Sequence, residues 1–174
     1  MADYDAIDEF GKTNDYVMTI VEIPKGSTMK IEFNRGTKTF EVDRVEPAIF
    51  AKPTNYGFIP NTLDEDGDAL DTLIVTDEPL PSGVVVKAKV IGMLDFEDGG
   101  ENDHKIVVVP DDDRQTGDSI KSLDDLPEQL KKQIEHHFSH YKDLKKPGST
   151  NVRGWGDAAE AWKIIEECVE RFKK

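Results

Sequence analysis

The stretch DEDGDALDTLIV, residues 64–75, places five acidic residues within eight positions. Asp66 and Asp68 flank Gly67, so a tight turn can direct both carboxylates to one side. Asp71 then opens an apolar run rich in β-branched residues, which is typical of a strand. Carboxylates held this close raise one another's pKa unless a cation offsets the repulsion. Because oxygen-only ligands suit hard ions, the triple indicates a site for Mg²⁺ or Ca²⁺.

A second acidic cluster, LDFEDGGENDHK, follows another predicted strand. Its charged members are Asp95, Glu97, Asp98, Glu101, Asp103 and Lys105. Taken alone, this segment is most simply a polar hairpin loop. Taken with the first cluster, it could complete a site for two or more metal ions, the usual device for phosphoryl displacement.

An ordinary solvated loop is the alternative interpretation of the first cluster, because short motifs often match by chance. An EF-hand fits poorly, since its twelve-residue loop needs a helix on each side and a terminal Glu. The segment after Leu70 has the pattern of a strand instead. Asp64 and Glu65 are expected to be solvated flanks with no role of their own.

Basic and phenolic residues that could neutralise a bound anion are scattered along the chain. They are Lys30, Arg44, Tyr56, Lys105, Tyr141 and Lys142. Lys30 and Glu32 stand two residues apart on a predicted strand, so their side chains share a face. For each basic residue, an ordinary ion pair on a strand face is the alternative to a binding role.

Short strands followed by two helices must position these residues. Apolar alternation between turn residues predicts strands at 16–24, 29–33, 39–45, 71–76, 83–94 and 104–110, with a hairpin turn at 34–38. Helical spacing predicts helices within 125–144 and 156–174. Asp124 or Asp125 should cap the first helix, and Asp157 with Glu160 forms a capping box for the second. The pattern predicts an α+β fold, a small β-barrel with two amphipathic C-terminal α-helices packed on it.

Length and charge limit the class of protein. The 174 residues predict a single domain over 1–174, in which residues 1–14 form a loosely packed N-terminal arm. A net charge of −14 argues against general binding to nucleic acid, and no apolar run is long enough to span a membrane. The first residues lack a signal-peptide pattern, and the single Cys168, expected to be buried, can form no internal disulfide. We therefore expect a cytoplasmic protein.

Several short motifs occur in order along the chain. They are VEIP at 21–24, KIE at 30–32, VDR at 42–44, NYGFIP at 55–60, DEDGDALDTLIV at 64–75, DGGENDHK at 98–105 and HYKDL at 140–144. Together they resemble the soluble family I inorganic pyrophosphatases of prokaryotic type, from about residue 15 to about residue 165. One departure is Ala69, where that family's aspartate signature usually has Pro and sometimes Glu. Ala69 should loosen the turn, because Pro would lower the entropy of the unfolded chain.

The resemblance implies a role for each matching residue. Metal ligands fall on Asp66, Asp71, Asp98 and Asp103, with Glu32 acting mainly through water and Glu22 as a further acidic site residue. Asp68 matches the family's proposed general base. The substrate contacts match Lys30, Arg44, Tyr56, Lys105, Tyr141 and Lys142.

The same resemblance implies a small closed five-stranded OB-like β-barrel, assembled as a homohexamer. It implies hydrolysis of pyrophosphate to two orthophosphates by direct attack of a water that bridges metal ions, with Asp68 removing its proton. Several Mg²⁺ ions per subunit are expected; Mn²⁺ or Zn²⁺ could substitute, and Ca²⁺ should inhibit. The expected partners are pyrophosphate and further copies of the chain, with no nucleic acid and no membrane.

Two other functions remain open at this point: a non-catalytic acidic module that binds Ca²⁺ or polyphosphate, and an interaction module that uses the C-terminal helix. His136 and His140, four residues apart on the first predicted helix, could chelate a transition metal. They lack a third ligand, so a solvated or subunit-contact face is the preferred interpretation. Lys52 stands where many bacterial family members have Tyr, and the sequence assigns it no role.

Overall fold

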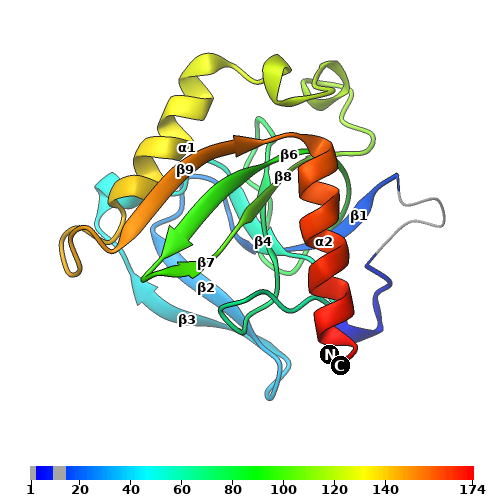
Figure 1. Ribbon diagram of the computed structural model, residues 1–174, viewed down its shortest axis with the longest axis horizontal. Helices are drawn as coiled ribbons and strands as arrows, with labels where there is room; N and C mark the ends of the chain where they lie inside the picture. Colours follow the sequence, from blue (N-terminus) through cyan, green and yellow to red (C-terminus); the bar gives the residue numbers. More distant parts are fainter. Residues whose placement is uncertain (1–2, 10–14) are drawn as a thin grey trace.

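Five strands close into a ring in which each strand pairs with two neighbours. The computed structural model describes residues 3–9 and 15–174. The ring runs through β1 (Val17–Ile23), β4 (Asn55–Phe58), β5 (Asp71–Ile74), β8 (Lys105–Pro110) and β6 (Val85–Asp98), and β1 pairs with β6 to close it. β5 and β8 are parallel, whereas the other ring pairs are antiparallel. The predicted α+β class, a five-stranded barrel-like ring with two flanking helices, is confirmed (Figure 1).

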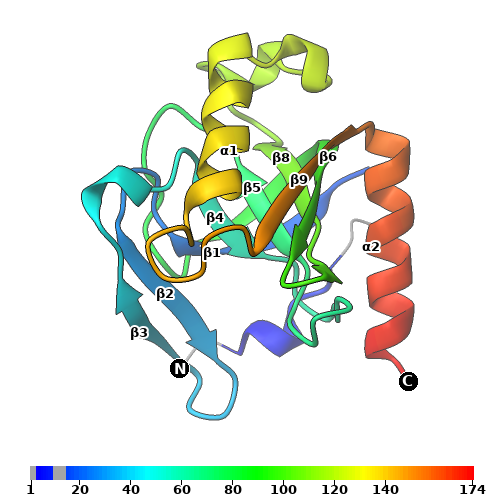
Figure 2. The same ribbon diagram turned by 60° about the vertical axis from the view of Figure 1, so that its left-hand side comes forward.

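Further strands attach to this ring or stand beside it. β2 (Met29–Asn34) and β3 (Thr39–Val45) form a separate antiparallel hairpin, which Figure 2 shows as an arm at one side of the molecule. The short β7 (Glu101–Asn102) and the longer β9 (Thr150–Gly156) both pair with β6. Sequence patterning did not predict β4, β7 or β9.

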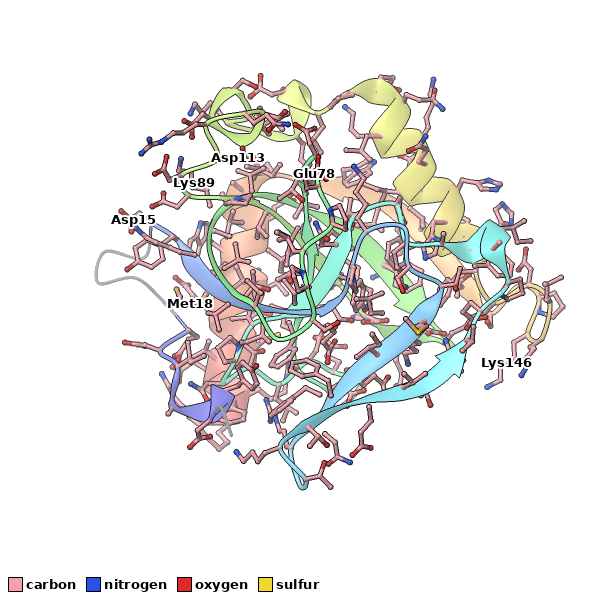
Figure 3. All side chains as sticks on the ribbon, turned by 180° about the vertical axis from the view of Figure 1, so that it is seen from behind. Asp15, Met18, Glu78, Lys89, Asp113 and Lys146 are labelled. Atoms are coloured by element: carbon pink, nitrogen blue, oxygen red, sulfur yellow. The ribbon has the colours of Figure 1, made fainter. Side chains whose placement is uncertain are left out.

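The apolar run of β8 is buried on both of its faces. Ile106 and Val108 pack in the cluster that contains the second helix, whereas Val107 and Val109 pack in the cluster that contains the first helix. Successive strand side chains point to opposite faces, so only a continuous apolar run can fill both clusters. Side chains crowd the space between sheet and helices, whereas Lys146, in the loop after the first helix, lies at the edge of the molecule (Figure 3).

The two α-helices begin in different ways. α2 (Ala158–Phe172) has the predicted capping box, because Glu160 N–H donates to Asp157 Oδ1 at 2.9 Å and Asp157 N–H donates to Glu160 Oε2 at 2.9 Å. α1 (Glu128–His140) has Pro127 at its N-cap and no side-chain cap. The prediction of Asp124 or Asp125 as its cap was wrong, because Asp125 serves the capping box of a preceding 3-10 turn, η4 (Leu123–Asp125). No helix within the described residues is long and apolar enough to cross a membrane.

Three more 3-10 turns connect the elements: η1 (Tyr4–Ala6), η2 (Ala48–Phe50) and η3 (Gly117–Ser119). Residues 1–14 were expected to form a loosely packed arm, but Tyr4 is packed. It is buried, and its hydroxyl donates to Gly83 O at 2.9 Å. The Tyr4 ring also packs edge-on against Phe33 of the hairpin. Residues 1–2 and 10–14 of the expected arm lie outside the described residues.

Gly57 allows β1 and β4 to approach closely, and this gives a testable consequence. A Cβ at Gly57 would lie 2.0 Å from the carbonyl oxygen of Ile20, a backbone atom that cannot rotate away. We expect Gly57→Ala to lower the free energy of unfolding by about 1–3 kcal/mol or more, measured by urea denaturation. Gly36→Ala is the matched control, because a Cβ there meets only Asn34 Oδ1, at 3.3 Å. Equal urea midpoints for the two variants would contradict this account of the contact.

Candidate active site

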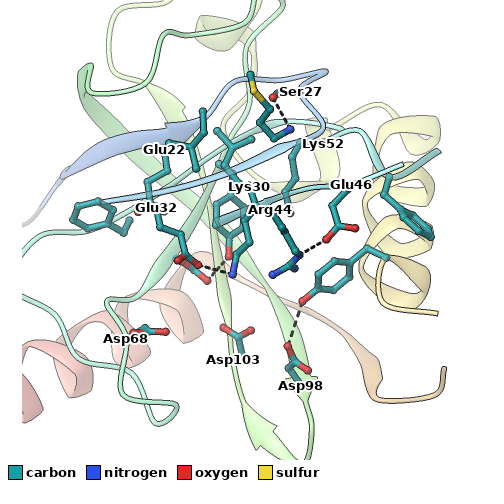
Figure 4. Close-up of a pocket in the computed structure, with 18 of the residues that line it drawn as sticks. Glu22, Ser27, Lys30, Glu32, Arg44, Glu46, Lys52, Asp68, Asp98 and Asp103 are labelled. Atoms are coloured by element: carbon teal, nitrogen blue, oxygen red, sulfur yellow. Dashed lines mark hydrogen bonds and ion pairs between the residues drawn. The ribbon is translucent and has the colours of Figure 1, made fainter. Parts of the chain in front are cut away.

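A cleft of about 550 Å³ lies between the β2–β3 hairpin, the ring and the C-terminal end of α1. Figure 4 shows Asp68, Asp103 and Asp98 along one side of it, with Lys30 and Arg44 opposite. Every residue predicted for the site lines this cleft except Lys105. The lining residues from that prediction are Glu22, Lys30, Glu32, Arg44, Tyr56, Asp66, Asp68, Asp71, Asp98, Asp103, Tyr141 and Lys142.

The aspartate loop between β4 and β5 presents two carboxylates to the cleft. Gly67 adopts φ +92°, a conformation that favours glycine. The Asp68 N–H donates to Asp66 Oδ1 at 3.0 Å, and the Asp64 N–H closes the loop by donating to Asp68 O at 2.7 Å. Neither Asp66 nor Asp68 forms an ion pair within the described part of the chain. Both carboxylates are therefore available to a cation or to water.

Asp64 corrects one sequence-based expectation. It is only 4% exposed, rather than a solvated flank, and burial raises its pKa to about 6. Its Oδ1 accepts from the Glu65 N–H and lies 3.7 Å from Arg171 Nη1 on α2. Cys168, buried as expected, also contacts it, at 3.6 Å. Asp64 therefore ties the aspartate loop to α2, while Glu65 is exposed as expected.

The parallel pairing of β5 with β8 brings together groups far apart in sequence. Asp71 and Lys105 are register partners at the first residue of each strand. Lys105 Nζ donates to Asp71 Oδ2 at 2.6 Å and to Asp103 Oδ1, and the Tyr56 hydroxyl donates to Asp71 Oδ2. Lys105 is only 2% exposed and does not line the cleft. Its ammonium lies beneath the carboxylates, so contact with a substrate would require it to move.

The end of β6 meets the end of α1 across the cleft. Asp98 is the last residue of β6, and Tyr141 is the C-cap of α1. Asp98 Oδ2 accepts from the Tyr141 hydroxyl at 3.2 Å and from Lys142 Nζ. Long-range packing thus joins the second acidic cluster to the motif HYKDL.

The β2–β3 hairpin supplies basic groups from the opposite side. Lys30 and Arg44 are cross-strand partners next to a β-bulge, so both can reach the cleft. Lys30 Nζ lies 2.5 Å from Glu32 Oε1, and Arg44 donates to Asp43 Oδ2 at 2.8 Å and to Glu46. Glu46 was not among the predicted site residues, although its place two residues after Arg44 gave a local signal.

Burial makes several of these carboxylates harder to ionise. It raises the pKa of Asp66, Asp68 and Asp103 above the usual range and that of Glu22 to about 8. An added cation would lower these pKa values again. The donor set is carboxylate oxygen, which fits a hard ion such as Mg²⁺.

In residues 3–9 and 15–174, no three His, Cys, Asp or Glu side chains form a ready-made metal cluster. The oxygens of Asp71, Asp98 and Asp103 bind Lys105 and Lys142 instead. The histidine pair on α1 lies elsewhere: the His136 and His140 rings are 4.6 Å apart, and His140 Nδ1 lies 2.8 Å from Asp143 Oδ2.

Sequence reasoning left out two basic residues that line the cleft, Arg35 and Lys52, of which Lys52 lies against aromatic rings. Its Nζ lies 4.7 Å from the centroid of the Tyr56 ring and 5.2 Å from that of Tyr141. The available signal was its position just before the motif NYGFIP. That position did not predict what the Lys52 side chain contacts, because Tyr56 comes from β4 and Tyr141 from the end of α1.

A barrel-like ring that carries a cleft lined by carboxylates and basic groups defines a class of α+β proteins suited to binding anions together with metal ions. A sequence profile described as inorganic pyrophosphatase matches residues 19–173. The chain belongs to the inorganic pyrophosphatase family, and the resemblance inferred from its motifs is confirmed.

Similar proteins agree over nearly the whole length. The inorganic pyrophosphatase of Neisseria meningitidis serogroup A is 59% identical over 175 residues, which cover 100% of this chain and 99% of that protein. The crystal structure of an inorganic pyrophosphatase from Neisseria gonorrhoeae has a TM-score of 0.95 at 57% identity and covers 99% of this chain and 100% of that one. The inorganic pyrophosphatase from Thermus thermophilus has a TM-score of 0.91 at 36% identity, with the same coverage.

Proposed function

We propose that the protein hydrolyses inorganic pyrophosphate to two orthophosphates with the help of Mg²⁺. The observation that carries this proposal is the convergence of carboxylates from two acidic loops with basic groups from the hairpin and α1 in one cleft. Catalysis of phosphoryl transfer depends almost entirely on positioning and on neutralisation of charge. The cleft contains the groups that both tasks require.

The metal ligands in this proposal are Asp66, Asp71, Asp98, Asp103 and Glu32. When bound, Mg²⁺ supplies positive charge that offsets the substrate anion and makes water more acidic. Asp66 is free to bind it, whereas Asp71 and Asp103 must share their oxygens with the Lys105 ammonium. Mn²⁺ or Zn²⁺ should substitute, and Ca²⁺ should inhibit because it favours more ligands at longer distances.

The remaining residues accept the proton of the attacking water or neutralise the negative charge of the substrate. Asp68 is the proposed general base: it lines the cleft, and its carboxylate has no ion-pair partner among the described residues. Arg44 and Lys30 line the cleft from the hairpin, and Tyr141 with Lys142 lines it from the turn that follows α1. We propose that these groups donate hydrogen bonds to phosphoryl oxygens, with Tyr56 and Lys105 orienting Asp71 from behind.

Phosphate release from pyrophosphate is the direct test. We expect release with Mg²⁺, none after removal of metal by EDTA, and inhibition when Ca²⁺ is added. Phosphate release that continues at the same rate in EDTA would contradict the metal requirement. An absence of phosphate release with Mg²⁺, Mn²⁺ and Zn²⁺, together with tight Ca²⁺ or polyphosphate binding, would identify a non-catalytic acidic module instead.

Assembly and location also belong to the proposal. A homohexamer is expected from the family resemblance, and exposed apolar side chains such as Ile49 and Leu144 support contact between subunits. We also propose a single domain over 1–174 and a cytoplasmic location, and the buried Cys168, which forms no disulfide, supports the latter. Sedimentation of the purified protein measures the assembly directly.

A further inference from the structure

Lys52 is positioned by backbone hydrogen bonds to the turn between β1 and β2. Its N–H donates to Ser27 O at 3.0 Å, and its carbonyl accepts from the Gly26 N–H at 2.9 Å. Pro53 follows, and the fixed φ of proline restricts the backbone at this point. The side chain lines the same cleft as Lys30 and Arg44 (Figure 4), and both of these charges act on it.

Aromatic faces surround the Lys52 ammonium. Nζ lies 4.7 Å from the Tyr56 ring centroid, 5.2 Å from that of Tyr141 and 5.5 Å from that of Phe138. These distances fall within the range of cation–π attraction. The rings orient the ammonium without taking up its hydrogen-bond donors, so those donors are available to a ligand.

Lys52 lacks the carboxylate partner that its neighbours have. Lys30, for example, pairs with Glu32 at 2.5 Å. Within the described residues, Lys52 forms no ion pair, and its polar side-chain contact is His137 Nε2 at 3.4 Å. Burial lowers the pKa of His137 to about 3, so the ring is neutral at pH 7 and adds no charge to the site. A half-buried charge without a partner is unfavourable, and a bound anion would provide that partner.

We propose that Lys52 is a further substrate-binding residue, whose ammonium donates a hydrogen bond to a phosphoryl oxygen of the anion in the cleft. The proposal rests on the proposed function, since it takes the substrate to be a diphosphate. In this proposal, the rings of Tyr56, Phe138 and Tyr141 position the Lys52 ammonium by cation–π attraction and leave its positive charge unneutralised.

Protonation of Lys52 should then depend on the anion. Burial, with the nearby Lys105 charge, lowers the pKa of Lys52 to about 7. The titratable and charged groups that face it are Lys30 and Arg44 from the hairpin, Tyr56 from β4, Asp71 from β5, Lys105 from β8, and His137 and Tyr141 from α1. Asp71 alone among them raises the Lys52 pKa at neutral pH, and it already accepts from Lys105. A bound polyanion adds negative charge and must raise that pKa.

Because the Lys52 pKa is higher in the ligand-bound protein than in the free protein, the affinity for the anion depends on pH. Well below pH 7, Lys52 is charged with and without ligand, so its contribution to affinity is complete there. Above pH 7, the free protein loses the proton and binding must take it up again, so the contribution decreases with rising pH. An arginine at this position stays charged throughout the range and should remove this part of the pH dependence.

The test measures the Kd of methylenediphosphonate, which is not hydrolysed at its bridging carbon, with saturating Mg²⁺ at pH 6.5 and pH 8.5. Lys52→Met should weaken binding by about ten- to a hundredfold at pH 6.5, and by less at pH 8.5. Lys52→Arg should gain affinity relative to the wild type as pH rises. Comparison with the wild type at each pH cancels the protonation of the ligand itself. Because no turnover is needed, the result stands apart from the test of pyrophosphate hydrolysis.

Lys163→Met is the matched control, because it removes the same charge from the exposed face of α2 and should leave Kd unchanged. Thermal melting verifies that each variant is folded, and Lys52→Arg tests the pH effect if Lys52→Met does not fold. A Kd for Lys52→Met within twofold of the wild type at pH 6.5 would overturn the contact. An equal loss at both pH values would overturn the linkage to protonation.

Discussion

Replacing Asp68 with asparagine should lower kcat for pyrophosphate hydrolysis by about 10²–10⁴-fold, the usual contribution of a positioned general base. The amide has nearly the same shape as the carboxylate but accepts a proton poorly. The backbone N–H of residue 68, which donates to Asp66 Oδ1, is unaffected by the change. The loop should therefore keep its shape, and metal affinity should change much less than kcat.

Metal binding by calorimetry and initial rates across pH separate these two effects. Asp112→Asn is the matched control, since Asp112 pairs with Arg114 in an exposed loop away from the cleft and should leave kcat unchanged. A rate for Asp68→Asn equal to that of the wild type at every pH would show that another group takes the proton. Equal losses of metal affinity and kcat would instead make Asp68 a ligand.

Replacing Lys105 with methionine should destabilise the metal-free protein by about 3–5 kcal/mol, because it leaves buried carboxylates without their cation. Burial alone would lower the pKa of Lys105, but Asp71 and Asp103 raise it above its ordinary value. The ammonium is thus held charged between two carboxylates. Mg²⁺ should restore part of the lost stability, because it supplies positive charge to the same oxygens.

Urea unfolding in EDTA and in saturating Mg²⁺ measures both parts of this prediction. Lys87→Met is the matched control, since it breaks an exposed pair with Asp111 and should change the midpoint little. The wild type should also unfold at a higher urea concentration with Mg²⁺. Equal midpoints with and without saturating metal, in both the wild type and Lys105→Met, would refute binding of metal by these aspartates.

Local sequence predicted part of the cleft, namely its aspartate loop. Gly67 between two aspartates encodes a turn and a pair of carboxylates within a few residues, and the ordered motifs identified the family. Most strands and both helices follow from apolar spacing in the same way. β4 and β9 did not, because NYGF and TNVRGWG lack clear apolar alternation and depend on pairing with other strands.

Tertiary structure decided which charges are exposed and what each one contacts. Lys105 has the sequence context of a ligand-binding residue, but the parallel register of β5 and β8 buries it against Asp71. Asp64 lies at the edge of the aspartate motif in sequence, but in the fold it contacts Cys168 and Arg171 of α2. Lys52 acquires its surroundings from β4 and α1. The sequence by itself determined the kinds of groups in the site and the family to which the chain belongs. Only the fold determined burial and partners, because a side chain's desolvation and charge neighbours come from segments distant along the chain.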